Sequence, residues 1–465
     1  MKISFFNTLT KQKEVFKPIN PPQVGIYTCG PTVYSRPHIG NLRAYVFADV
    51  LRRTLEYAGY SVRHVVNITD VGHLTSDADE GEDKMSKGLR REGMEVTREN
   101  MIRLGQTYAA EFKKDLDALN ILPPHEMPRA SDYIKEDIEL IQKIASKGYV
   151  YEISDGLYFD TAKFKPYGRL STLSSGLSRV RSNSGKRNPK DFALWKKNVS
   201  LGWPSPLGAG FPGWHLECSA MSRRFLGEVF DIHTGGVDHI PIHHSNEIAE
   251  SEAVSGKVPA RYWLHCEHVI SQGAKLAKSE GVLLTLDSLT RLNIPPLAYR
   301  FWLLSAHYRT RVDFTLGAVA AGGKALVRLA SRLTDCREEG QPVSGYIKRF
   351  EEAAGNDLDT PAILSLIQEV LGDKELSEAE KKATVLRFDS VLGLGLHELK
   401  ALFRNLLPSL IPREKLPADA LKLFEERETA RRNGDFVLAD KLRLMLAEKD
   451  FRLEDTPAGT LIYKL

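Results

Sequence analysis

One stretch of the sequence, Val24 to Ile68, constrains the fold more than any other. It reads as a short apolar strand, a turn rich in glycine and proline, an amphipathic helix beginning near Asn41, and a second strand from Val62. Strand, glycine-containing turn, helix and strand make a βαβ unit, which opens a doubly wound parallel sheet. Nucleotide-binding folds hold phosphate at such a turn. The stretch therefore predicts an α/β chain with a nucleotide-binding sheet.

The chain of 465 residues is too long for one hydrophobic core, so several domains are expected. Residues from about Tyr149 to Pro212 look like an insertion with short strands. From about Ile294 the chain is almost wholly helical to Lys449, and it ends in a short hairpin. We predict a Rossmann-like domain of doubly wound parallel sheet, an inserted connective subdomain and an α-helical C-terminal region.

The composition is that of an ordinary globular protein, with 42% hydrophobic and 27% charged residues. The net charge of +4 permits a nucleic-acid partner without requiring one. Four cysteines are too few and too scattered for a disulfide scaffold. Nothing at the N-terminus resembles a signal peptide, and no apolar run approaches the ~18–20 residues of a membrane span. We expect a cytoplasmic protein without a membrane partner.

The segment "RPHIGNLRAY" is the first candidate for chemistry. Gly40 allows a ligand to approach the backbone, and a helix starting near Asn41 directs its free N–H groups and positive dipole end at an anion. His38 can donate a hydrogen bond to phosphate as charge develops there. A capped helix with an incidental histidine explains the same residues, and the segment alone does not decide.

The segment "GAKLAKSEG" is the second candidate. Lys275 and Lys278 are two cations in a glycine-flanked loop that can close over a triphosphate, although pairs of surface lysines are commonplace. The string "DKMSKG", from Asp83 to Gly88, looks similar but lies in a charged excursion directly after the βαβ unit. We interpret it as exposed and coincidental.

A scattered set of metal-ligand residue types is the third candidate. His243 and Glu247 are four residues apart, so on a helix both point the same way. With Cys29 and Cys218 they can make a tetrahedral zinc site. Buried free cysteines are the ordinary alternative, because the spacing contains no CxxC.

The segment "HTGGVDH" is the fourth candidate. Gly236 lets a ligand lie against the backbone, and Asp238 can accept hydrogen bonds from ribose hydroxyls. An ordinary glycine-rich turn explains this segment equally well.

Taken together, "HIGN" and "KLAKS" resemble the two signatures of the class I aminoacyl-tRNA synthetases. The closer resemblance is to the cysteinyl-tRNA synthetase family, through "YTCGPTVY", "NITDV", "YGRLS", "DFALWK", "PGWHLECSAM", "FDIHTGGVDH", "HHSNEIAESEA" and "DFVLADKLRLMLAEKDFRLEDTPAGT". These segments follow the family's order over nearly the whole chain. The sequence departs from the family at Asn41, Leu276, Ala277 and Ser245, which removes none of the candidate ligands or cations.

The resemblance implies a two-step reaction, in which L-cysteine and ATP give cysteinyl-adenylate and the cysteinyl group passes to tRNA(Cys). It implies one Zn²⁺ per chain, bound by Cys29, Cys218, His243 and Glu247 and gripping the substrate thiol, and Mg²⁺ with ATP. A soft metal prefers thiolate to the neutral hydroxyl of serine, whereas shape alone separates small side chains by only ~1–3 kcal/mol. A separate editing domain is then unnecessary.

The resemblance also implies a role for each remaining candidate. The expected catalytic residues are His38, Asn41, Lys275 and Lys278. The expected ATP-binding residues are His38, Gly40, Asn41, Gly236, Asp238, Val269 and Lys278. The cysteine pocket is expected to comprise Cys29, Gly30, Thr32 and Trp214.

The implied domains have the following bounds. Residues 1–120 and 213–293 form the two halves of the catalytic domain, 121–212 the connective insertion, 294–405 a helical bundle, and 406–465 an anticodon-binding module. We expect a monomer.

Two other functions stay open. One is a cysteine ligase that joins cysteinyl-adenylate to an amino sugar, and the other is an inactive RNA-binding paralogue. The full helical C-terminal third argues against the first, and the intact set of ligands and lysines argues against the second.

Overall fold

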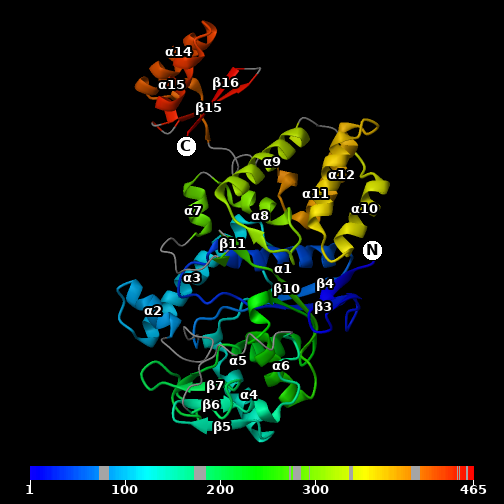
Figure 1. Cartoon of the computed structure of the whole chain (residues 1–465), viewed down its shortest axis with the longest axis vertical. Coiled ribbons are helices and arrows are strands. Elements are labelled where there is room, and N and C mark those ends of the chain that lie inside the picture. Colours follow the sequence, from blue (N-terminus) through cyan, green and yellow to red (C-terminus); the bar gives the residue numbers. More distant parts are fainter. Residues whose placement is uncertain are drawn as a thin grey trace.

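Figure 1 shows the structure, a computed structural model of the whole chain. It describes residues 1–72, 83–171, 185–271, 274–275, 284–292, 294–334, 339–398, 409–447, 449, 451–456 and 459–464. The predicted catalytic residue Lys278 lies outside these residues, and of Lys275 only the backbone is described.

A sheet of four parallel strands, in the order β10-β9-β3-β4, occupies the middle of the chain's fold. Its members are β3 (Gln23–Thr28), β4 (Ser61–Val66), β9 (Phe230–Gly236) and β10 (Ala260–Cys266). Strand β9 is buried along nearly its whole length, as expected for a parallel strand covered on both faces. The predicted doubly wound sheet is confirmed, and β9 and β10 come from the second half of the predicted domain.

Helices cover both faces of this sheet. Helix α1 (Ile39–Tyr57) joins β3 to β4 and packs against β4, β9 and β10. Helices α5 (Leu216–Leu226) and α6 (His243–Ser255) pack against each other, and α5 contacts β3. Figure 1 shows α1 on one side of the sheet and α5 and α6 on the other.

Three helices follow the first βαβ unit: α2 (Lys84–Arg91), α3 (Arg98–Ala118) and α4 (Ile134–Ser146). The prediction that the stretch around "DKMSKG" is exposed was wrong, because Met85 and Leu89 of α2 are fully buried. Two apolar residues four apart are enough to anchor a two-turn helix, while Lys87, Arg90 and Arg91 are exposed.

The insertion contains an antiparallel sheet in the order β5-β6-β7-β8. Its strands are β5 (Val150–Ile153), β6 (Gly156–Phe159), β7 (Phe192–Lys197) and β8 (Gly210–Pro212). The structure thus places strands where the sequence predicts short ones. Phe159 and Phe192 stack within this sheet, with ring centroids 4.9 Å apart.

A second small sheet, β12-β11-β13, follows β10 and leads into the helical region. It consists of β11 (Val269–Ser271), β12 (Ala274–Lys275) and β13 (Val312–Asp313). The helices that follow are α7 (Leu286–Arg291), α8 (Pro296–Leu304), α9 (Leu316–Thr334), α10 (Ser344–Gly355), α11 (Thr360–Gly372) and α12 (Glu378–Leu392). They share one hydrophobic core with α1 and with β1 (Ser4–Asn7), which pairs with β2 (Gln12–Val15) in an N-terminal hairpin.

The C-terminal segment has a hydrophobic core of its own, formed by residues such as Phe424, Leu446 and Phe451. Its elements are β14 (Ser409–Leu410), α14 (Ala418–Arg432), α15 (Phe436–Ala447), β15 (Phe451–Thr456) and β16 (Gly459–Lys464). Strands β15 and β16 form the predicted terminal hairpin. Among the helices that the structure describes, none is long and apolar enough to cross a membrane.

Candidate active site and metal centre

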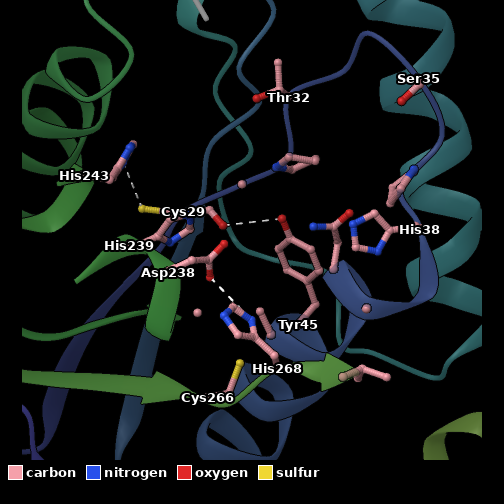
Figure 2. A pocket seen from close by; sticks show the side chains of 18 of the residues that line it. Cys29, Thr32, Ser35, His38, Tyr45, Asp238, His239, His243, Cys266 and His268 are labelled. Carbon is pink, nitrogen blue, oxygen red and sulfur yellow. Dashed lines mark hydrogen bonds and ion pairs between the residues drawn. The ribbon is translucent and has the colours of Figure 1, made fainter. Parts of the chain in front are cut away.

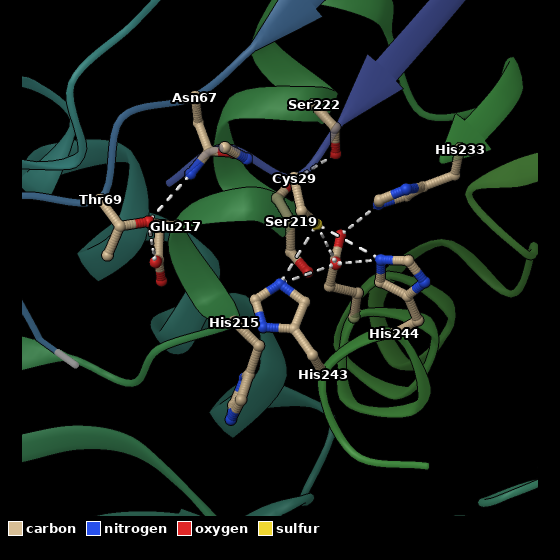
Figure 3. Close-up of polar contacts among 12 residues, drawn as sticks. Cys29, Asn67, Thr69, His215, Glu217, Ser219, Ser222, His233, His243 and His244 are labelled. Atoms are coloured by element: carbon tan, nitrogen blue, oxygen red, sulfur yellow. Dashed lines mark hydrogen bonds and ion pairs between the residues drawn. The ribbon is translucent and has the colours of Figure 1, made fainter. Parts of the chain in front are cut away.

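Four side chains far apart in the sequence meet at the carboxyl end of β3. Cys29 follows β3, Cys218 lies on α5, and His243 and Glu247 lie on α6. One ligand atom from each lies within 4.8 Å of the others, and all four residues are buried. The Cys29 Sγ atom is 3.4 Å from His243 Nε2 and 3.6 Å from Glu247 Oε1 (Figure 3). The predicted ligand set therefore forms a cluster that can hold a metal ion.

Local structure explains this convergence. His243 and Glu247 are one turn apart on α6, and His243 Nε2 lies 3.2 Å from Glu247 Oε1. Helix α5 contacts both β3 and α6, which carries Cys218 to the same point. Parallel strands end at the same edge of a sheet, so the segment after β3 meets the segments after β9.

The charges of the cluster favour the ionised forms of Cys29 and Glu247, whereas burial raises the pKa of Cys218, and, against burial, Cys29 and Glu247 raise that of His243. Burial opposes ionisation of the Cys29 thiol, but the hydrogen bond with Cys218 and the positive His243 outweigh it and lower the pKa of Cys29 to about 5. Burial likewise opposes ionisation of Glu247, yet His233 and His243 hold its pKa below the ordinary value. A thiolate and a carboxylate are the forms that bind metal.

Further histidines that the sequence analysis did not identify surround this cluster. His233 Nε2 lies 2.8 Å from Glu247 Oε2, and His244 Nε2 lies 3.3 Å from Cys29 Sγ. These two, with Cys29 and Glu247, form a second possible ligand set. His244 Nδ1 in turn lies 2.7 Å from His265 Nε2. These histidines lie on a helix and two strands, but the sequence does not reveal where their rings point.

A cavity of about 410 Å³ opens beside the metal-ligand cluster (Figure 2). The residues predicted to bind ATP or cysteine that line it are Cys29, Gly30, Thr32, His38, Gly40, Asn41, Trp214, Gly236, Asp238 and Val269. The ligand His243 also lines it. Residues from the "HIGN", "PGWH" and "HTGGVDH" segments therefore share one cavity.

The N-terminus of α1 forms one wall of this cavity. His38 is the N-cap residue, in an extended conformation, and its carbonyl accepts from the Asn41 N–H at 2.9 Å. The helix begins at Ile39, slightly earlier than predicted, so Gly40 and Asn41 lie in its first turn. The first turn of a helix offers unpaired N–H groups and the positive end of the dipole to an anion.

The wall nearest the metal-ligand cluster carries the predicted cysteine-pocket residues. The Trp214 ring lies 4.6 Å from the His243 ring, centroid to centroid. The backbone N–H of Gly30 donates to Asn67 Oδ1 at 2.7 Å. Asn67 also donates to Thr69 Oγ1, and Thr69 donates to Glu217 next to Cys218 (Figure 3). This chain of hydrogen bonds connects the segments that carry the two cysteines.

Another part of the cavity lining comes from the ends of β9 and β10 and from β11. Asp238 lies in the turn after Gly236, and its Oδ1 is 4.0 Å from His268 Nδ1. Val269, the first residue of β11, is buried. Tyr45, which sequence reasoning missed, lines the cavity and donates its hydroxyl to the Cys29 carbonyl at 3.4 Å.

Lys84 is a second residue that sequence reasoning missed. It belongs to the string "DKMSKG", which was interpreted as coincidental, yet it lines the cavity. Its Nζ lies 5.5 Å from the centroid of the Trp214 ring. The helix-start pattern, an aspartate three residues before Ser86, was the available signal.

Comparison with known proteins agrees with this geometry. Residues 15–322 match the family model described as tRNA synthetases class I (C) catalytic domain. A protein named cysteine–tRNA ligase 1 from Burkholderia lata is 44% identical, covering 100% of this chain and 97% of its own length. A cysteine–tRNA ligase from Zymomonas mobilis is 39% identical, and the match covers 98% of this chain and 97% of that protein.

Solved structures are similar in fold. A methionyl-tRNA synthetase from Mycobacterium tuberculosis bound by methionyl-adenylate has a TM-score of 0.54 at 13% identity, covering 83% of this chain and 92% of its own. A LeuRS–tRNA–LeuAMS complex from Agrobacterium radiobacter has a TM-score of 0.58 at 11% identity, and the match covers 83% of this chain and 86% of that chain. At such identities the likeness concerns the fold alone.

Proposed function

The chain belongs to the cysteine–tRNA ligase family of the class I tRNA synthetases, and we propose that it charges tRNA(Cys) with L-cysteine. The cysteine carboxylate attacks the α-phosphate of ATP, giving cysteinyl-adenylate and pyrophosphate. The 3′-terminal adenosine of the tRNA then attacks the mixed anhydride, and AMP leaves. The observation that carries the proposal is the Cys29, Cys218, His243 and Glu247 cluster on the wall of a cavity that the "HIGN" segment also lines.

We propose zinc as the metal of this cluster. Zinc bonds of about 2.0–2.3 Å in a tetrahedron place ligand atoms about 3.3–3.8 Å apart. The separations involving Cys29, His243 and Glu247, between 3.2 and 3.6 Å, fit such a site. Bound zinc supplies a soft Lewis acid, for which a thiolate is a far better ligand than the neutral hydroxyl of serine.

The other site residues position the phosphates of ATP and stabilise the charge that develops during the reaction. We assign His38, Gly40 and Asn41 to the phosphates of ATP, which enters with Mg²⁺, because the N-terminus of α1 favours anions. Lys275 and Lys278 are assigned to the charge that develops on pyrophosphate. No side chain needs to act as a covalent nucleophile.

The remaining cavity residues are assigned to the two small substrates. Gly236 and Asp238 hold the adenosine and Val269 the adenine, because they line the same cavity as the "HIGN" segment. Gly30, Thr32 and Trp214 enclose the amino acid beside Cys29.

We further propose that the chain acts as a monomer in the cytoplasm. Every residue assigned above comes from a single chain, so no second copy is needed to complete the site. Free cysteines at the metal-ligand cluster require a reducing compartment. We assign anticodon binding to residues 406–465 and the connective role to residues 121–212.

The test is cysteine-dependent exchange of pyrophosphate into ATP, followed by charging of a tRNA(Cys) transcript. Both activities are expected. Exchange without charging indicates instead a ligase that transfers cysteine to an amino sugar. No exchange by the zinc-loaded protein indicates an inactive RNA-binding paralogue. Coverage of 97% of the Burkholderia lata cysteine–tRNA ligase 1 supports the expectation of both activities.

A further inference from the structure

Helix α2 is fixed against the segment that leads to His38. Asp83 caps it by accepting from the Ser86 N–H at 2.7 Å, and Met85 and Leu89 are fully buried. A Cβ added at Gly88 would lie 2.8 Å from the Tyr34 carbonyl oxygen, so the helix packs closely on this segment. The backbone at Lys84 is therefore held in place by packing and by the N-cap.

The side chain of Lys84 reaches the cavity at its metal-ligand end. Its Nζ lies 5.5 Å from the Trp214 ring centroid, within cation–π range, and the same ring packs on His243. Among the described lining residues, Lys84 and Arg36 are the lysine and arginine side chains. Lys84 thus places an ammonium group beside the aromatic ring that borders the metal-ligand cluster.

We propose that Lys84 binds the α-carboxylate of the substrate amino acid, an inference that rests on the proposed function. A cysteine whose sulfur is held at the metal-ligand cluster has its carboxylate only about 4 Å away, within the space bordered by Trp214. Attack on ATP brings this carboxylate toward another anion, and a neighbouring cation reduces their repulsion.

Lys84 stays protonated throughout the step. A carboxylate oxygen forms a bond to the α-phosphorus while the bond from this phosphorus to pyrophosphate breaks. The electron pair leaves with pyrophosphate, so no proton passes through the lysine. Its role is to bind and orient the substrate.

The experiment compares Lys84→Met with Lys84→Arg in the zinc-loaded, full-length enzyme. Cysteine and ATP affinities come from pyrophosphate exchange, and cysteamine, which lacks the carboxylate, serves as a competitive inhibitor. Lys84→Met is expected to weaken cysteine binding about 10- to 100-fold, the range for a lost charge-assisted contact, and to leave cysteamine inhibition and ATP affinity unchanged. Lys84→Arg should recover most of the loss. The matched control is Lys87→Met, on the exposed side of the same helix.

Three results would overturn the inference. Equal weakening of cysteine and cysteamine would mean that Lys84 only supports the Trp214 ring. A loss of affinity for ATP alone would mean that the Lys84 ammonium group contacts the nucleotide. Unchanged affinities would mean that it contacts neither substrate. If the wild-type enzyme shows no cysteine-dependent exchange, the proposed function fails first, which separates the two failures.

Discussion

Gly30 illustrates how closely the site depends on single residues. A Cβ at this position would lie 1.4 Å from the backbone oxygen of Asn67, far inside van der Waals contact. Glycine therefore allows the segment carrying Cys29 to lie against the segment after β4. The hydrogen bond from the Gly30 N–H to Asn67 Oδ1 fixes this approach.

The substitution Gly30→Ala should displace Cys29 from the metal-ligand cluster. We expect zinc content and cysteine-dependent exchange to fall together by at least about tenfold, because backbone atoms on both sides must move. Metal analysis and exchange kinetics measure the two effects. Gly317→Ala is the control, since a Cβ there meets nothing within 4 Å. Normal zinc content in Gly30→Ala would contradict this account.

The sequence identified many of the residues in the site but not their surroundings. Residue types alone made Cys29, Cys218, His243 and Glu247 one candidate set, and only the family resemblance favoured a shared metal, because no spacing rule connects residues so far apart. His233 and Lys84 were missed for physical reasons. The first lies on a buried strand, where the sequence does not tell which side chains face a cluster. The second was hidden in a charged segment that tertiary packing made helical.

At the scale of elements, one buried arginine joins α1 to the helical region. Arg300 of α8 is fully buried and pairs with Asp49 of α1 at 2.5 Å. It also donates to the carbonyls of Leu392 and Leu119, at 2.9 Å each. The helix whose N-terminus is assigned to ATP is therefore connected to α12 through hydrogen bonds as well as hydrophobic packing.

Arg300→Met should destabilise the protein by about 3 kcal/mol, because it leaves Asp49 and two carbonyls short of a buried partner. The remaining contact from Arg53 to Asp49 at 2.8 Å limits the loss to the lower part of the usual range. Urea unfolding measures this loss in the free energy of unfolding. The control is Arg349→Met, which removes an exposed pair with Glu369 and should cost less than about 1 kcal/mol. Equal stability of the two variants would refute this role for Arg300.

The C-terminal segment has its own electrostatic anchor. Asp455 of β15 accepts two hydrogen bonds from Arg427 of α14, at 2.5 and 2.7 Å, and also pairs with Arg431. The hydrogen bond with Arg427, together with that from Thr460, outweighs partial burial and lowers the pKa of Asp455 to about 2. The pair joins helix α14 to the terminal hairpin.

This pairing predicts a pH dependence with a definite sign. The pKa of Asp455 is lower in the folded state than the value of about 3.9 for an unfolded chain. Its stabilisation is therefore complete above about pH 4 and is lost as the pH falls from 4 toward 2. Hydrogen exchange of β15 and β16 should be faster in Asp455→Asn than in wild type at pH 7, with the difference shrinking near pH 2. A constant difference across this range would count against the assignment.

At the scale of the whole molecule, the parallel sheet carries residues of the cavity, and helices cover the sheet and follow it along the chain. The parallel sheet brings the ends of β3, β9 and β10 together, and the cavity lies at that edge. The C-terminal segment, with α14, α15, β15 and β16, lies at one end of the molecule, away from the parallel sheet (Figure 1). This arrangement is consistent with our proposal that one part of the chain binds the 3′ end of the tRNA and residues 406–465 bind its anticodon.

The most direct test of the central claim measures zinc content together with amino-acid selectivity in pyrophosphate exchange. The account predicts about one zinc per chain, exchange supported by cysteine and not by serine, and loss of both properties in Cys218→Ser without loss of ATP binding. A zinc-free enzyme that still exchanges with cysteine and still rejects serine would contradict it.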